Sequence, residues 1–241
     1  SYTFTAVHTP DPAGDDDPLQ LEGTGSTVLA VWKEIPETSY LIGTAEKLAD
    51  FRDMVNNGET NAKTTATLTA DIDLGDETWT PIMGYTGTFD GGGHTISGLY
   101  VDSDTGRAGL FGSVAGGTVR NLAVEGKVTA SGETSENYSY TGGVVGENSG
   151  TVENCAFSGI VADNSVIRNN AICVGGVAGY NTGTVQNCYS TGSVTATDDG
   201  DSPVILSFTG GVVGRNGGLP DGTVKNCYYR NGEGYPTVGI G

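Results

Sequence analysis

Basic residues are scarce in this sequence. Lys and Arg number 11 among 241 residues, against 29 Asp and Glu, so the formal net charge is −18. A chain of this charge repels phosphate groups, and we therefore expect no nucleic-acid partner. No apolar run approaches the roughly 18 residues that a membrane-spanning helix requires, so we also expect no membrane span.

Cysteine, histidine and proline are sparse as well. The four cysteines show no Cys-x-x-Cys spacing and the two histidines lie far from them in the sequence, so no zinc site is expected. Only 8 residues are Pro, and the 40 glycines follow no three-residue period, which excludes collagen. Because the sequence starts at Ser1 without a signal-like segment and stops without an anchor motif, we expect a trimmed piece of a longer protein.

The abundant glycines belong to an internal repeat. Four segments combine a Gly-Gly-Val-x-Gly-like element with Gly-Thr-Val-x-Asn, whose threonines are Thr118, Thr151, Thr184 and Thr223, at spacings of 33, 33 and 39 residues. The last spacing is longer because residues 217–221 enlarge one turn. Short strands between Gly and Asn turns bury an apolar face only when identical units stack. The sequence therefore predicts an all-β fold, a parallel β-helix with one repeat per coil.

Stacking places equivalent residues about 4.8 Å apart, in columns. Alternation predicts an inward valine column starting at Val119 and an outward column starting at Arg120, in which no like charges are adjacent. Asparagines starting at Asn121 fall at a corner, where they tolerate left-handed geometry. The next column is expected to face inward because its first member is Leu; it comprises Leu122, Cys155, Cys188 and Cys227. We interpret these cysteines as small core residues, with a Cys155–Cys188 disulfide as an alternative.

The repeats resemble the GLUG motif, through Gly143-Val144-Val145-Gly146, Gly150-Thr151-Val152-Glu153-Asn154 and their counterparts over residues 107–232. GLUG arrays occur in surface and secreted proteins of bacteria, including large adhesins. The resemblance implies a right-handed β-helix, a position outside the cell or on the cell surface of a bacterium, and neighbouring domains in a larger surface protein. It implies no catalytic or binding residue, because the motif is structural.

The residues before the repeats divide into three segments. We expect residues 1–35 to form a β-hairpin-like segment or the tail of an upstream module, and residues 36–63 to form a helical cap. The cap helix is predicted over residues 44–57, with Thr44 as its N-cap and an apolar stripe of Leu48, Phe51 and Val55. Residues 64–241 form the predicted β-helix. At its far end we expect either an exposed last coil or residues 234–241 folded over it.

Three kinds of candidate site remain. We interpret the acidic clusters as solvated turns, and calcium binding is the alternative. The best metal candidates are Asp198, Asp199 and Asp201. We expect no other cofactor. Tyrosines in outward slots and turns of the C-terminal half suit sugars or a host surface protein; they are Tyr180, Tyr189, Tyr228 and Tyr229. Asp71 and Asp73 share a strand face and His94 lacks an evident acidic partner, so we expect no enzyme.

The sequence thus favours a non-catalytic module of an exported surface protein that acts in adhesion or ligand binding. Two alternatives stay open. One is a stiff spacer that presents other domains, and the other is a polysaccharide-degrading β-helix enzyme.

Overall fold

The computed structural model describes residues 19–20, 29–30, 38–133, 138–166, 171–197, 206–218, 221–230 and 236–238. Contacts divide the chain into two units, Ser1–Pro36 and Glu37–Gly241. In the first unit, β1 (Leu19–Gln20) pairs antiparallel with β2 (Leu29–Ala30). The remainder of the segment predicted at residues 1–35 lies outside the described residues.

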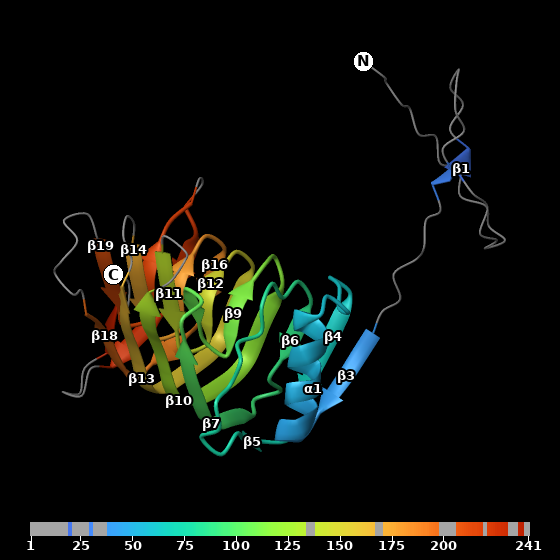
Figure 1. Ribbon diagram of the computed structural model, residues 1–241, viewed down its shortest axis with the longest axis horizontal. Coiled ribbons are helices and arrows are strands. Elements are labelled where there is room, and N and C mark those ends of the chain that lie inside the picture. The colour runs from blue at the N-terminus through green and yellow to red at the C-terminus, as the bar shows by residue number, and fades with distance from the viewer. Residues whose placement is uncertain are drawn as a thin grey trace. The chain divides into compact units, whose positions relative to one another are not determined.

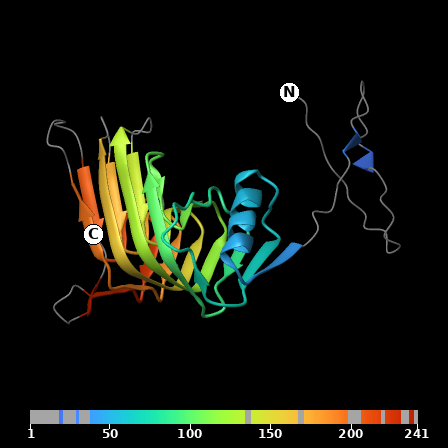
Figure 2. The ribbon, with the colours of Figure 1, turned by 60° about the horizontal axis from the view of Figure 1, so that its bottom comes forward.

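The described residues of the second unit are mostly β-structure in three sheets, with one short helix, and the strands lie side by side along the unit (Figures 1 and 2). Sheet I has a main path of β3 (Thr38–Ile42), β4 (Thr64–Leu68), β6 (Thr88–Asp90), β10 (Thr118–Glu133), β13 (Thr151–Val166), β17 (Tyr189–Ser190), β22 (Tyr228–Arg230) and β23 (Pro236–Val238). Side members of Sheet I are β5 (Ile72–Asp73), β7 (Thr95–Ser103), β16 (Thr184–Gln186), β18 (Ser193–Ala196) and β21 (Thr223–Lys225).

The two smaller sheets take one strand each from successive repeats. Sheet II contains β8 (Arg107–Ala108), β11 (Tyr138–Gly142), β14 (Ala171–Gly175) and β19 (Leu206–Gly210). Sheet III contains β9 (Phe111–Val114), β12 (Val145–Asn148), β15 (Ala178–Asn181) and β20 (Val213–Asn216). All pairings within these two sheets are parallel, which is compatible with the predicted parallel β-helix.

The register of Sheet I follows the sequence repeat. Thr118 pairs with Thr151, Thr151 with Thr184 and Thr184 with Thr223, so the extra residues of the last spacing do not shift the register. The valine column faces inward as predicted: its first three members are fully buried and the last is partly buried. The repeat alignment therefore predicted the strand pairing correctly.

The corner asparagines adopt the predicted left-handed geometry. Their φ angles lie between 52° and 53°, a region that Asn enters more readily than most residues; they are Asn121, Asn154, Asn187 and Asn226. Neighbouring amides hydrogen-bond between coils: Asn154 Nδ2 donates to Asn121 Oδ1 over 3.1 Å, and Asn226 Nδ2 donates to Asn187 Oδ1 over 3.0 Å. The corner column thus links successive turns through side chains as well as backbone.

The cysteine column lies in the core. All four cysteines are buried and free, and the alternative Cys155–Cys188 disulfide is therefore not formed in this structure. The sulfurs of this column donate to backbone carbonyls, for example Cys188 Sγ to Val152 O at 3.7 Å. A hydrogen bond from the Cys188 thiol to the neighbouring Cys155 sulfur, together with burial, raises the pKa of the Cys188 thiol. These side chains behave as small core residues.

A second asparagine column, which the sequence analysis did not identify, lies inside the unit. Asn148 and Asn181 are fully buried. Asn148 Nδ2 donates to Asn181 Oδ1, and Asn181 Nδ2 donates to Asn216 Oδ1, both over 2.7 Å. Asn148 Oδ1 also accepts from the backbone N–H of Gly150 over 3.1 Å. The column therefore satisfies polar groups at the turn between Sheet III and Sheet I.

Helix α1 (Ala45–Asn56), the one helix among the described residues, lies at the N-terminal end of the sheets (Figures 1 and 2). Leu48, Phe51 and Val55 are its buried residues, as predicted. The Phe51 ring lies 5.8 Å from that of Tyr85 and 6.0 Å from that of Phe89, so the helix packs on the aromatic part of the core. Strand β3 precedes the helix inside the segment predicted only as a helical cap, and it pairs parallel with β4.

Thr44 caps the helix, as the sequence predicted. Its side-chain oxygen accepts from the backbone N–H of Lys47 over 3.3 Å. We expect Thr44→Ala to lower the free energy of unfolding by about 1 kcal/mol, because one helix N–H loses its partner. Equilibrium urea denaturation measures this change. Thr44→Ser keeps the acceptor and serves as the control, and an equal loss in both variants would contradict a capping role.

The two ends of Sheet I differ. At the C-terminal end β23 pairs antiparallel with β22, so residues 236–238 cover the edge of that strand, while β19 and β20 remain the outer strands of Sheets II and III. At the other end β3 is the outer strand, with Leu41 67% exposed. The described residues contain no helix long and apolar enough to cross a membrane.

Candidate functional site

Tyr189 and Tyr228 form an exposed aromatic pair on Sheet I. The two residues are in register on β17 and β22, and they are 53% and 54% exposed. The buried residues before them, Cys188 and Cys227, fix the alternation that turns both rings outward. The structure therefore places this predicted pair side by side on the surface.

The other two predicted tyrosines lie elsewhere. Tyr229 follows Tyr228 on β22 and packs against the core, and a Cβ added to Gly211 would come within 2.1 Å of its ring. Tyr180 lies on β15 in Sheet III, away from the pair on Sheet I. The four predicted residues thus do not form one surface.

Tyr180 belongs instead to a stack of three tyrosines. The Tyr140 ring lies 4.8 Å from the Tyr180 ring and 4.4 Å from the Tyr138 ring, with interplanar angles of 26° and 10°. Tyr138 and Tyr140 come from β11 in Sheet II, so the stack joins the two smaller sheets. In such a stack the ring faces cover one another, and the edges and hydroxyl groups remain for other contacts.

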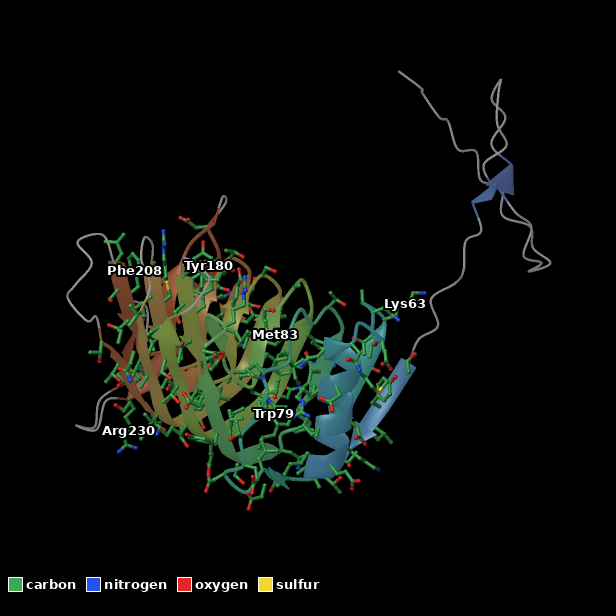
Figure 3. The ribbon with its side chains drawn as sticks, in the orientation of Figure 1. Lys63, Trp79, Met83, Tyr180, Phe208 and Arg230 are labelled. Carbon is green, nitrogen blue, oxygen red and sulfur yellow. The ribbon has the colours of Figure 1, made fainter. Side chains whose placement is uncertain are left out.

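An arginine lies at each end of the stack. The Arg107 guanidinium carbon is 4.8 Å from the centre of the Tyr138 ring, and that of Arg215 is 5.7 Å from the Tyr180 ring. Arg215 also lies 4.8 Å from the ring of Phe208, and Figure 3 shows Phe208 and Tyr180 along the same edge of the unit. We call the group the Tyr–Arg strip; it comprises Arg107, Tyr138, Tyr140, Glu147, Tyr180, Phe208 and Arg215.

The two arginines have different partners. Arg107 Nε donates to Glu147 Oε2 over 2.6 Å, and Arg107 also hydrogen-bonds the Tyr138 hydroxyl. Arg215 has no carboxylate partner among the residues that the structure describes. Its guanidinium lies near the Cys173 thiol. Arg107 is therefore neutralised within the strip, and Arg215 is not.

Burial acts on the Tyr140 hydroxyl of the strip and on the neighbouring Cys173 thiol. It raises the pKa of the Tyr140 hydroxyl above its usual range. Burial likewise raises the pKa of the Cys173 thiol to about 12, although the positive charge of Arg215 acts in the opposite direction. The strip contains two guanidinium groups and one carboxylate group. This local excess of positive charge contrasts with the −18 of the whole chain.

A signal for the strip was present in the sequence. Alignment on Gly-Thr-Val-x-Asn predicted the columns of Sheet I, but the strip lies beside the Gly-Gly-Val-x-Gly element. The residue directly after that element is Glu147, Tyr180 or Arg215 in successive repeats, and these three pair in register. An alignment on both elements would have placed these residues in one column.

The predicted metal candidates Asp198, Asp199 and Asp201 lie outside the described residues. Elsewhere, no group of three or more His, Cys, Asp or Glu side chains in the described part of the chain is arranged to hold a metal ion. Asp73 Oδ1 accepts from the backbone N–H of Gly75 over 2.9 Å, as in an Asx turn. This carboxylate therefore has a local structural role.

Asp71 and His94 form a contact that their separation in sequence concealed. Asp71 Oδ1 lies 3.1 Å from His94 Nδ1 and accepts from the backbone N–H of Thr95 over 3.0 Å. The Thr95 hydrogen bond and then the His94 contact lower the pKa of the Asp71 carboxyl below its usual range. The Asp71 side chain is 76% exposed, so water screens the pair.

A hollow of about 280 Å³ lies between β3 and α1, distant from both groups of tyrosines along the strand order. Asp50 is the carboxylate in its lining. Glycoside hydrolysis uses a pair of carboxyl groups across the scissile bond. The lining of this hollow does not supply such a pair.

Comparison with known proteins agrees with the repeat geometry. The family model described as the GLUG motif matches residues 137–162 and 170–195, which include the second and third of the four repeats. The chain contains GLUG motifs. It is also 30% identical over 156 residues to halomucin of Haloquadratum walsbyi, a match that covers 53% of this chain and 2% of halomucin. No solved structure matches the GLUG-containing chain at a significant level.

Proposed function

We propose that this chain is a non-catalytic module of an extracellular or cell-surface protein, folded as a right-handed parallel β-helix, which binds a glycan or a host surface protein. The GLUG motifs and the similarity to halomucin support a surface-protein module. The in-register parallel pairing of successive repeats supports the β-helix. The single-carboxylate lining of the hollow supports a role without catalysis.

The observation that carries the binding role is the pair Tyr189 and Tyr228. Each ring is about half exposed and each lies on a rigid strand, so a ligand contacts both rings with little loss of conformational freedom. Aromatic rings are enriched at the centres of interfaces, where they contribute much of the binding energy. The same column holds Ala123 and Ala156 in the first two repeats, so the aromatic surface is confined to the last two.

We expect a screen of the full chain against glycans, mucin and matrix proteins to give a reproducible ligand. The double variant Tyr189→Ala with Tyr228→Ala should bind this ligand about tenfold more weakly, because two ring contacts contribute on the order of 1.4 kcal/mol. Surface plasmon resonance measures the affinities, with calcium and with chelator. A chelator effect would assign a role to calcium.

Leu41→Ala is the matched control, because Leu41 is also a large exposed side chain but lies on β3 at the other end of Sheet I. Its affinity should equal that of the unmodified chain. If no ligand is found, or if the tyrosine variant binds every ligand normally, the binding role is wrong. Such a result would favour a stiff spacer held together by the buried valine and asparagine columns.

A further inference from the structure

We propose that the Tyr–Arg strip binds a saccharide that carries a carboxylate group, with Arg215 as the anchor for the anion. This inference rests on the proposed binding role of the module, but it concerns Sheets II and III rather than the tyrosine pair on Sheet I. The strip combines hydroxyl groups, ring edges and one guanidinium without a carboxylate partner among the described residues.

The tyrosine stack supplies polar contacts along a line. Its rings lie 4.4 Å and 4.8 Å apart, so little ring face remains for an apolar ligand. The hydroxyl groups of Tyr140 and Tyr180 both donate and accept, and the raised pKa of Tyr140 keeps its proton in place. A linear saccharide presents hydroxyl groups at regular intervals, which suits a row of phenols better than an apolar peptide does.

Arg215 supplies the charge selectivity. A guanidinium forms two parallel hydrogen bonds to a carboxylate, and this geometry favours a planar anion over a neutral group. The Phe208 and Tyr180 rings, at 4.8 Å and 5.7 Å, restrict the side chain and reduce the entropy lost on binding. Arg107 is a weaker candidate for the anchor because its guanidinium already forms an ion pair with Glu147.

The position of Arg215 at the edge of Sheet III also favours ligand binding. Arg215 lies on β20, the outer strand of Sheet III, and the described residues place no further strand beside it. Its column contains Glu147 and Tyr180 on the preceding strands, so the charge changes from negative to neutral to positive towards this end. A ligand with its carboxylate at Arg215 and its neutral part over Tyr180 would follow this gradient.

The overall charge of −18 limits the kind of ligand. A densely charged polymer is repelled at long range, whereas one carboxylate at Arg215 gains a short-range contact. We therefore expect modest affinity for short acidic saccharides. Their advantage over neutral saccharides should decrease as salt is added.

The test compares a trisaccharide of two galactose residues and one terminal galacturonate with the corresponding galactose trisaccharide by isothermal titration calorimetry of the full chain. We expect the acidic saccharide to bind at least tenfold more tightly. Arg215→Gln should remove this difference, while Arg215→Lys should retain part of it. Arg230→Gln is the matched control, since Arg230 is exposed and lies at the opposite edge of the unit in Figure 3. Thermal unfolding confirms that each variant is folded.

Each remaining result contradicts the proposal. Equal binding of both saccharides, binding of neither, or an unchanged preference in Arg215→Gln would overturn it. Equal binding of an end-blocked tripeptide with a single glutamate would show that the strip binds an acidic peptide rather than a saccharide. The Tyr189→Ala, Tyr228→Ala variant separates this proposal from the function proposed above: it should keep the preference for the acidic saccharide even if it loses another ligand.

Discussion

Gly150→Ala should lower the free energy of unfolding by about 3 kcal/mol or more, because the new methyl group meets the backbone of the previous coil. A Cβ at this position would lie 2.0 Å from Gly117 O. The same carbonyl accepts the hydrogen bond of the Thr151 N–H over 2.9 Å, so a shift that relieves the overlap breaks the pairing between the two coils. Gly183 faces Gly150 O in the same way, at 2.1 Å.

Gly116→Ala is the control for this prediction. Gly116 has a φ of +87° but nothing within 4 Å of its Cβ position, so this variant has backbone strain without overlap. We expect it to lose only about 1 kcal/mol. Equilibrium denaturation in urea compares the two variants. A similar loss in both would show that the coils accommodate the new methyl group, and that close approach does not require glycine at position 150.

Asp163→Ala should also lower the free energy of unfolding by about 3 kcal/mol, because it removes the acceptor at the centre of a buried polar network. Asp163 is fully buried. Its Oδ2 accepts from Ser139 Oγ over 2.6 Å and from Thr141 Oγ1 over 2.7 Å, and its Oδ1 accepts from the Ser165 N–H over 2.9 Å. The substitution leaves these donors without their carboxylate.

Steric strain does not account for the expected loss. Asp163 pairs in register with Ala130 on one side and Ala196 on the other, so alanine already occupies this position in the adjacent coils. Chemical denaturation of the full chain measures the effect. A variant as stable as the unmodified chain would indicate that the desolvation of the buried carboxylate outweighs its hydrogen bonds.

A triple variant isolates the network. Ser139→Ala and Thr141→Val, added to Asp163→Ala, remove the two hydroxyl donors together with the acceptor. The next coil carries Ile172 and Val174 at the positions of Ser139 and Thr141, so apolar residues fit there. We expect the triple variant to recover part of the lost stability, because removing both hydroxyl donors together with the acceptor leaves fewer unsatisfied groups, although Ser165 still loses its partners.

The parts of the fold that repeat in the sequence were predictable. In-register stacking turns each aligned position into a column, and the valine, cysteine and corner asparagine columns were found in this way. The alignment also predicted the neighbours Tyr189 and Tyr228, because both directly follow a cysteine of that column. Local patterns were sufficient for α1, whose apolar stripe and cap depend only on nearby residues.

Features that break the repeat were not predictable. Asp163 is a single carboxylate between alanines of the adjacent coils, and its partners come from another strand of the same repeat region. The Asp71–His94 contact joins residues outside the repeats. The tyrosine stack depends on side-chain directions across two sheets, which strand alternation alone does not determine.

The in-register pairing determines how much length and how much surface each added repeat contributes to such a module. Each repeat of 33 residues adds one strand to Sheet I, which lengthens the stack by about 4.8 Å. The same residues in an extended chain would span about 110 Å. Repetition is therefore an inefficient way to reach farther from an attachment point, but each added repeat enlarges the outer surface of every sheet. Selection on the outward columns of individual repeats can then diversify that surface while the inward columns stay the same.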